Sequence, residues 1–243
     1  MIVVCASLKK SGSGWYFNMT NDLLVQAGHQ DVRMLRRDYA LANVLLEENC
    51  RINPNAINLA RLLPAHRKGN TFAVKTHAGP TPSLRLLMNL GIAKTTYIYR
   101  DPRDVVLSAL DHGKRVRKAG QANVLATLRN VEDAVHYVRP LLDDWEAWTR
   151  THQALMIRYE DLVVDALGVL DRLAGFLRLD VSQDDLREVV ACYAPRDQNT
   201  VVQQRTHFNK GVTERFRNQM SPAELALCQN QFGPYLQRMG YAA

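Results

Sequence analysis

The chain has 243 residues, of which 47% are hydrophobic and 23% charged, and its formal net charge at pH 7 is +7. This length and hydrophobic content are sufficient for a full core in a single domain over residues 1–243, and the positive charge favours an anionic ligand. No apolar stretch approaches the roughly 20 residues of a membrane span, and the four widely spaced cysteines argue against a disulfide framework or a zinc site.

The N-terminal residues predict a strand, a glycine-rich turn and a helix. The strand is the apolar run Ile2–Ser7, and the helical spacing of apolar residues extends over 16–26. The turn between them reads Lys9-Lys10-Ser11-Gly12-Ser13-Gly14-Trp15. Backbone N–H groups in such a turn, together with the helix dipole, form a site for phosphate or sulfate. The lysine precedes the glycines, so the turn differs from a Walker A loop.

This first strand begins at residue 2, which leaves no room for a signal peptide, and unpaired cysteines suit a reducing compartment. We therefore expect a cytoplasmic protein.

Three further short runs, nearly all apolar or β-branched, are expected to be parallel strands covered on both faces. They span 71–75, 95–99 and 154–158. One helical segment spans 101–118 and begins with Asp101 as its N-cap. A second spans 123–150, and we expect either one helix bent at Pro140 or two helices that meet there.

The C-terminal third predicts more helices. A strongly amphipathic helix is expected over 162–179, and Ser182 with Asp185 predicts a capping box for the next helix. Ser221 opens a similar box for the last helix, which we expect to end at Gly240. Residues 36–70 and 194–220 are the least regular segments, and we expect loops there that close over a ligand.

This alternation of strands and helices predicts an α/β doubly wound fold, with a central, mostly parallel sheet of about four to five strands flanked by helices. Ligands of such sheets bind beyond the carboxyl ends of the strands. The polar residues expected there are Lys10, Lys75, His77, Arg100, Ser108 and Tyr159. This set suits a nucleotide that carries two separate anionic groups.

Four of these segments resemble the sulfotransferases that use 3′-phosphoadenosine 5′-phosphosulfate (PAPS). Residues 9–15 resemble the family's 5′-phosphosulfate loop, Pro-Lys-Ser-Gly-Thr-Thr-Trp, and residues 100–108 resemble its 3′-phosphate motif. Residues 75–77 match its Lys-Thr-His, and residues 159–162 match its Tyr-Glu-Asp-Leu. A weaker fifth match places residues 209–211 on the family's Arg-Lys-Gly loop. The matches follow the family's order over nearly the whole chain.

The resemblance implies a P-loop-like nucleotide-binding fold and a set of residues that bind the PAPS donor. These residues are Lys10, Ser11, Gly12, Ser13, Gly14, Trp15, Arg100, Ser108, Tyr159, Asn209, Lys210 and Gly211. The turn would hold the phosphosulfate, and Trp15 and Tyr159 would contact adenine. Arg100 and Ser108 would bind the 3′-phosphate, over which Lys210 and Gly211 would close.

Three residues are expected to be catalytic. His77 would act as general base on the acceptor hydroxyl or amine, because histidine titrates near working pH. Lys10 would offset the charge that grows on the bridging oxygen, and Lys75 would bind a sulfuryl oxygen. In-line displacement would give a sulfated acceptor and adenosine 3′,5′-bisphosphate (PAP). No metal is expected, because lysines and backbone amides neutralise the charge.

The sequence departs from the family pattern at Asn209, where the family has an arginine. This change removes a charged donor to the 3′-phosphate, so we expect weaker donor binding unless Arg205, Arg215 or Arg217 compensates. This change also leaves a second interpretation open, in which the chain is an inactive relative that binds the nucleotide without transferring a group.

Two other classes fit less well. A P-loop kinase or NTPase would need Gly-Lys-Ser/Thr and a strand that ends in a magnesium-binding aspartate. A nucleic-acid-binding module would show a basic stripe with interleaved aromatic residues, whereas the basic residues here cluster at strand ends. The expected acceptor is a small molecule, a glycan or a lipid, and the family analogy allows a homodimer.

Overall fold

The computed structural model describes residues 1–46, 49–193 and 212–242. Within these residues four strands form one all-parallel sheet in the order β2-β1-β3-β4. The strands are β1 (Ile2–Ser7), β2 (Phe72–Thr76), β3 (Ala93–Tyr99) and β4 (Leu155–Arg158). The α/β fold with a parallel sheet is therefore confirmed, and each strand starts and ends within two residues of its predicted position.

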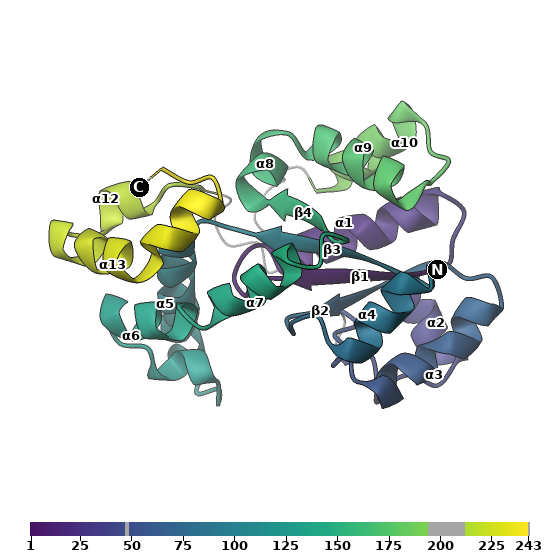
Figure 1. The fold of residues 1–243 in the computed structure, drawn as a ribbon, viewed down its shortest axis with the longest axis horizontal. Helices are drawn as coiled ribbons and strands as arrows, with labels where there is room; N and C mark the ends of the chain where they lie inside the picture. The colour runs from purple at the N-terminus through teal and green to yellow at the C-terminus, as the bar shows by residue number, and fades with distance from the viewer. Residues whose placement is uncertain (47–48, 194–211, 243) are drawn as a thin grey trace.

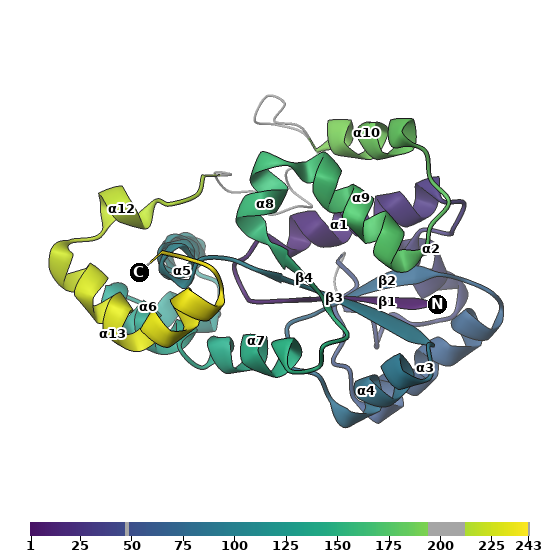
Figure 2. The ribbon, with the colours of Figure 1, turned by 45° about the horizontal axis from the view of Figure 1, so that its top comes forward.

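Helices cover both faces of the sheet and extend past one of its ends (Figures 1 and 2). In chain order they are α1 (Ser13–Gln26), α2 (Val32–Asp38), α3 (Ala56–Arg67), α4 (Pro82–Asn89), α5 (Pro102–Lys118), the 3₁₀ helix η1 (Val124–Thr127), α6 (Val131–Val138), α7 (Leu141–Thr149), α8 (Tyr159–Val164), α9 (Ala166–Leu177), α10 (Gln183–Cys192), α12 (Phe216–Gln219) and α13 (Pro222–Arg238). Helices α1, α8, α9 and α10 lie on one face, and α4 and α7 on the other. Helices α5, α6, α12 and α13 lie beyond the carboxyl ends of the strands.

Strand β1 lies in the interior of the sheet, where it pairs with β2 on one side and β3 on the other. All six of its residues are buried, as expected for a strand covered on both faces. The chain crosses from β2 over β1 to reach β3, so β1 and β3 are neighbours. The strand that follows β1 in the chain, β2, lies on one side of this pair, and the strand that follows β3, β4, lies on the other side. Such a switch point opens a crevice beyond the strands' carboxyl ends. The turn after β1 and the first residues after β3 both lie there.

Two α-helices lie in the segment 123–150, so of the two predicted alternatives the one with two helices that meet at Pro140 is confirmed. Helix α6 ends at Val138 and α7 begins at Leu141. The expected start at residue 123 is wrong, because η1 precedes α6 and Asn130 caps α6 by accepting a hydrogen bond from the N–H of Asp133 (2.9 Å). A capping side chain at this point favours a new helix start over continuation of the earlier turn.

The single helix expected over 162–179 is also wrong. Helix α8 ends at Val164, and α9 begins at Ala166. Between them Asp165 has φ −140° and ψ 71°, and its side chain accepts a hydrogen bond from the N–H of Gly168 (2.8 Å). The amphipathic pattern runs across this break, so hydrophobic spacing alone did not reveal it.

The segment 36–70 is more regular than expected, because it contains the 12-residue helix α3. Asn55 caps α3 by accepting from the N–H of Asn58 (2.8 Å), and Pro64 lies inside the helix. Of the other irregular segment, residues 194–211 lie outside the described part, and α12 follows them.

The predicted helix caps are confirmed. Asp101 accepts from the N–H of Arg103 (2.9 Å), and both capping boxes, at Ser182 and at Ser221, have their two reciprocal hydrogen bonds. The last helix ends at Arg238, two residues before Gly240, which has φ +77°. In the part of the chain that the structure describes, no helix is long and apolar enough to cross a membrane.

Candidate active site

The turn after β1 is held by its own serine and by the neighbouring strand. The Leu8 N–H donates to the carbonyl of Ile98 in β3 (3.0 Å). The Ser11 hydroxyl, which is fully buried, contacts the carbonyls of Leu8 (2.5 Å) and Ile98 (3.1 Å). This hydroxyl therefore supports the turn in the structure, and its expected contact with the donor stays a prediction.

The N-terminus of α1 has no side-chain cap. Gly12 occupies the N-cap position without a side-chain hydrogen bond, and the first turn has no acidic residue. The positive end of the helix dipole therefore lies at the switch point, beyond the carboxyl ends of β1 and β3. An anion bound there would accept the hydrogen bonds that a capping side chain provides in other helices.

Tyr159 packs directly against the glycine of this turn. Gly12 has φ +76°, and a Cβ on it would lie 2.6 Å from Cε2 of Tyr159. The same ring meets Trp15 edge to face, with centroids 6.3 Å apart, and lies 4.5 Å from the guanidinium carbon of Arg100. Tyr159 thus joins the turn after β1 to the predicted 3′-phosphate residue. Trp15 itself is buried, and its adenine contact stays a prediction.

Lys10 lies in the turn after β1, where it has φ +70° and is close to other cations. Burial above all, and next the nearby charges of Arg115, Lys75 and Arg100, lower the pKa of Lys10 to about 8, against an opposing effect of Asp111. Each of these cations disfavours the charged form of its neighbours. The predicted residues Lys10, Lys75 and Arg100 therefore do gather in one place.

His77 directly follows β2, next to the end of β1. Its ring Nδ1 lies 2.9 Å from the Ser7 hydroxyl and 3.3 Å from the Ser7 carbonyl oxygen. Burial above all, and next the charge of Lys75, lower the pKa of His77 to about 3, while the Ser7 carbonyl acts in the opposite direction. The expectation that His77 titrates near working pH is therefore wrong for the ligand-free protein, in which its ring is neutral at pH 7.

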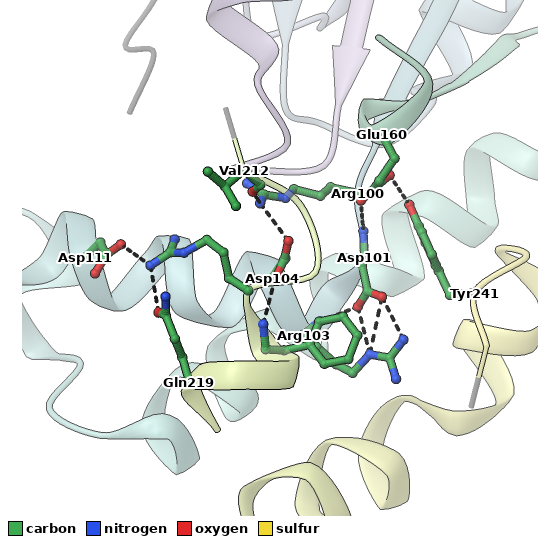
Figure 3. Close-up of polar contacts among 11 residues, drawn as sticks. Arg100, Asp101, Arg103, Asp104, Asp111, Glu160, Val212, Gln219 and Tyr241 are labelled. Atoms are coloured by element: carbon green, nitrogen blue, oxygen red, sulfur yellow. Dashed lines mark hydrogen bonds and ion pairs between the residues drawn. The ribbon is translucent and has the colours of Figure 1, made fainter. Parts of the chain in front are cut away.

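Arg100 shares the buried carboxylate of Asp104 with the C-terminal segment (Figure 3). Its Nη2 donates to Asp104 (2.8 Å) and to the Val212 carbonyl (2.7 Å), and the other Asp104 oxygen accepts from the N–H of Phe216 (3.2 Å). The Nε of Arg100 is buried and has no hydrogen-bond partner among the described residues. Ser108, eight residues on in α5, is buried as well.

A second group of contacts connects C-terminal residues to the start of α5, and Figure 3 shows those among Asp101, Glu160 and Tyr241. Glu160 accepts from the N–H of Asp101 (3.1 Å) and from the hydroxyl of Tyr241 (2.7 Å). Arg103 pairs with Asp101 (2.7 Å) and donates to the carbonyl of Ala242 (2.9 Å). In the structure Glu160 thus connects the start of α5 to Tyr241. Its partners are 59 and 81 residues away, so no local signal could have identified them.

The fifth predicted motif, Asn209, Lys210 and Gly211, lies outside the described residues, as does Arg205. Of the two other arginines considered as replacements, Arg217 pairs with Glu214 on the exposed surface. Arg215 is buried, and its Nη2 donates to Asp111 (2.7 Å) and Gln219 (3.1 Å).

A sequence model of a known family matches almost the whole chain. The model describes the sulfotransferase domain, and it aligns with residues 2–240. This chain belongs to the sulfotransferase domain family. No curated protein sequence matched it.

Solved structures of sulfotransferases share this fold at low sequence identity. Retinol dehydratase, in a complex with retinol and PAP, has a TM-score of 0.62 at 18% identity, covering 97% of this chain and 81% of that one. The mouse sulfotransferase SULT7A1, complexed with PAP, has a TM-score of 0.60 at 16% identity, covering 97% and 84%. The sulfotransferase domain from the curacin biosynthetic pathway has a TM-score of 0.55 at 13% identity, covering 100% and 98%. These matches show the sulfotransferase fold.

Proposed function

We propose that this sulfotransferase-family protein transfers the sulfuryl group of PAPS to an acceptor hydroxyl or amine and releases PAP. The observation that carries the proposal is the crowding of Lys10 by Lys75, Arg100 and Arg115 beside the uncapped end of α1. Like charges that lower one another's pKa are stabilised when an anion binds between them. A phosphosulfate at the turn supplies that anion.

The second anionic group of the donor fits the start of α5. Arg100 has a buried Nε without a partner among the described residues, and burying an unsatisfied donor costs about 1–3 kcal/mol. A 3′-phosphate that accepts this hydrogen bond removes the cost, and the planar guanidinium suits phosphate oxygens. Among the residues that the structure describes, Arg215, held by Asp111, is the buried arginine nearest in sequence to position 209.

The chain's own residues divide the chemistry as follows. His77 accepts the acceptor proton while the acceptor oxygen attacks sulfur. Lys10 and the amides of the turn stabilise the charge that grows on the departing phosphate oxygen, and Lys75 stabilises the sulfuryl oxygens. A bound phosphosulfate also offsets the cations that lower the pKa of His77, so the ring becomes a stronger base when the donor is present.

Binding specificity is the first test. We expect PAP to raise the melting temperature of the protein more than ATP or adenosine 5′-phosphate at equal concentration. At 100 times its Kd a ligand stabilises the folded state by about 2.7 kcal/mol. Arg187→Lys, at an exposed ion pair, is the control variant and should leave the response unchanged. A preference for ATP, or no response to the 3′-phosphate, would refute the proposal.

Transfer is the second test. PAPS labelled with sulfur-35 is incubated with the protein and a panel of phenols, sugars and lipids, and labelled products are separated and counted. We expect label to appear in at least one hydroxyl acceptor together with equimolar PAP. Tight PAP binding without transfer to any acceptor would favour the inactive relative instead.

A further inference from the structure

The side chain of Ser7 contacts the ring that we propose as general base. Ser7 ends β1 and His77 follows β2, and the two strands are paired neighbours. The Ser7 hydroxyl oxygen lies 2.9 Å from Nδ1 of His77 and 3.2 Å from the carbonyl oxygen of Thr76. The Ser7 carbonyl oxygen lies 3.3 Å from the same Nδ1. Ser7 is 3% exposed, and His77 is half-buried.

These three contacts can be satisfied together in only one way. Carbonyl oxygens only accept, and a serine hydroxyl has one hydrogen. If that hydrogen points to the Thr76 carbonyl, Nδ1 must carry a proton, which is then shared by the Ser7 hydroxyl and carbonyl oxygens. If it points to Nδ1 instead, the Thr76 carbonyl faces a lone pair of the Ser7 hydroxyl, and the Ser7 carbonyl faces the lone pair of Nδ1. Neither of these two contacts is then a hydrogen bond. The first arrangement makes all three contacts hydrogen bonds.

We propose that Ser7 is a positioning residue, which accepts the Nδ1–H of His77 and thereby keeps Nε2 as the unprotonated nitrogen. This inference rests on the proposed function, because it concerns the nitrogen that receives the acceptor proton. During transfer the acceptor oxygen forms a bond to sulfur, and the bond from sulfur to the bridging oxygen breaks. The electron pair of that bond leaves with PAP. The proton goes to Nε2, while Nδ1–H still donates to Ser7.

A hydroxyl beside Nδ1 of His77 affects the ring differently from a carboxylate in the same position. A carboxylate beside Nδ1 would also attract the positive ring, whereas a serine fixes the tautomer without adding charge. The charged groups that act on His77 are the cations Lys75, Lys9 and Arg51. With Ser7 as a neutral partner, the charge state of the ring depends on its burial, on these cations and on the anion that they bind.

The tautomer can be read directly in the ligand-free protein. Nitrogen-15 spectra of histidine-labelled protein distinguish a protonated Nδ1 from a protonated Nε2, and His77→Gln assigns the signal among the seven histidines. We expect wild-type His77 to be protonated on Nδ1 alone. In Ser7→Ala the signal should become a mixture of both tautomers. A wild-type signal from protonated Nε2 overturns the proposal.

Kinetics test the consequence. For Ser7→Ala we expect kcat to fall by about tenfold or more, since a positioned base contributes about 10²–10⁴-fold, with unchanged KM for PAPS. Ser7→Thr keeps the hydroxyl and should restore both the tautomer and kcat. Ser83→Ala, at a half-buried serine in α4, is the control variant. A lower kcat without a change of tautomer overturns the proposal, and so does a changed tautomer with wild-type kcat. If no acceptor is ever sulfated, the proposed function fails, while the spectra still decide the hydrogen bonding of Ser7.

Discussion

Replacing Gly12 with alanine should both strain the turn and displace Tyr159. The new residue would keep φ +76°, and its Cβ would lie 2.6 Å and 2.7 Å from two carbons of the Tyr159 ring. A left-handed conformation costs an L-residue roughly 1–2 kcal/mol, and overpacking in a buried site typically costs about 1–3 kcal/mol. We therefore expect Gly12→Ala to lower the free energy of unfolding by about 2–5 kcal/mol, measured by urea denaturation.

Gly28 separates the two effects. It has φ +81°, and a Cβ there would have no atom within 4 Å, so Gly28→Ala should show the backbone cost alone. The excess for Gly12→Ala, about 1–3 kcal/mol, then measures the contact with Tyr159. In a Tyr159→Leu background this excess should largely disappear. Equal losses for the two glycine variants would refute the reasoning. Because the displaced ring also contacts Arg100, PAP affinity should fall for Gly12→Ala only.

Three further predictions concern the charged groups. His77→Gln should lower kcat by about 10²–10⁴-fold in the transfer assay while leaving PAP affinity, measured by calorimetry, within about twofold. Burial and neighbouring cations lower the pKa of Lys10 to about 8, so free protein loses this charge as pH rises. PAP affinity should therefore fall by about tenfold between pH 7 and pH 9, and Lys10→Met should lack this part of the dependence; an unchanged slope in the variant would contradict the assignment. Arg100→Lys keeps the charge but loses the planar fork, and it should narrow the preference for PAP over adenosine 5′-phosphate by about ten- to hundredfold in competition binding.

The parts of this site that the sequence predicted are those encoded by neighbouring residues. Lys10 comes three residues after the end of β1, Lys75 is near the end of β2, and His77 directly follows β2. A buried strand therefore places these residues near the carboxyl edge of the sheet without knowledge of strand order. The caps at Asp101 and Ser182 were likewise identified because cap and partner lie within three residues. Local spacing is sufficient when the interacting groups are this close in sequence.

Helix breaks and long-range partners were not predictable in this way. The pattern of apolar residues over 162–179 continues through Asp165, so the periodicity of the core concealed a capping residue. The pKa of His77 depends on burial and on cations from other segments, which the sequence could not bring together. The role of Glu160 depends on Tyr241, 81 residues later.

The carboxylate of Asp104 lies close to Arg100, which we propose as a ligand of the donor's 3′-phosphate, and it influences how this arginine is oriented. Asp104 accepts from Arg100 and from the N–H of Phe216, so the same buried group orients the arginine and holds the segment that follows the predicted closing loop. Asp101 and Arg103 neutralise each other one turn away. A phosphate therefore meets an arginine whose orientation is already fixed, and binding needs little reordering of the side chain. Under the proposed function, donor recognition and the placement of the C-terminal segment therefore both depend on one buried carboxylate, Asp104.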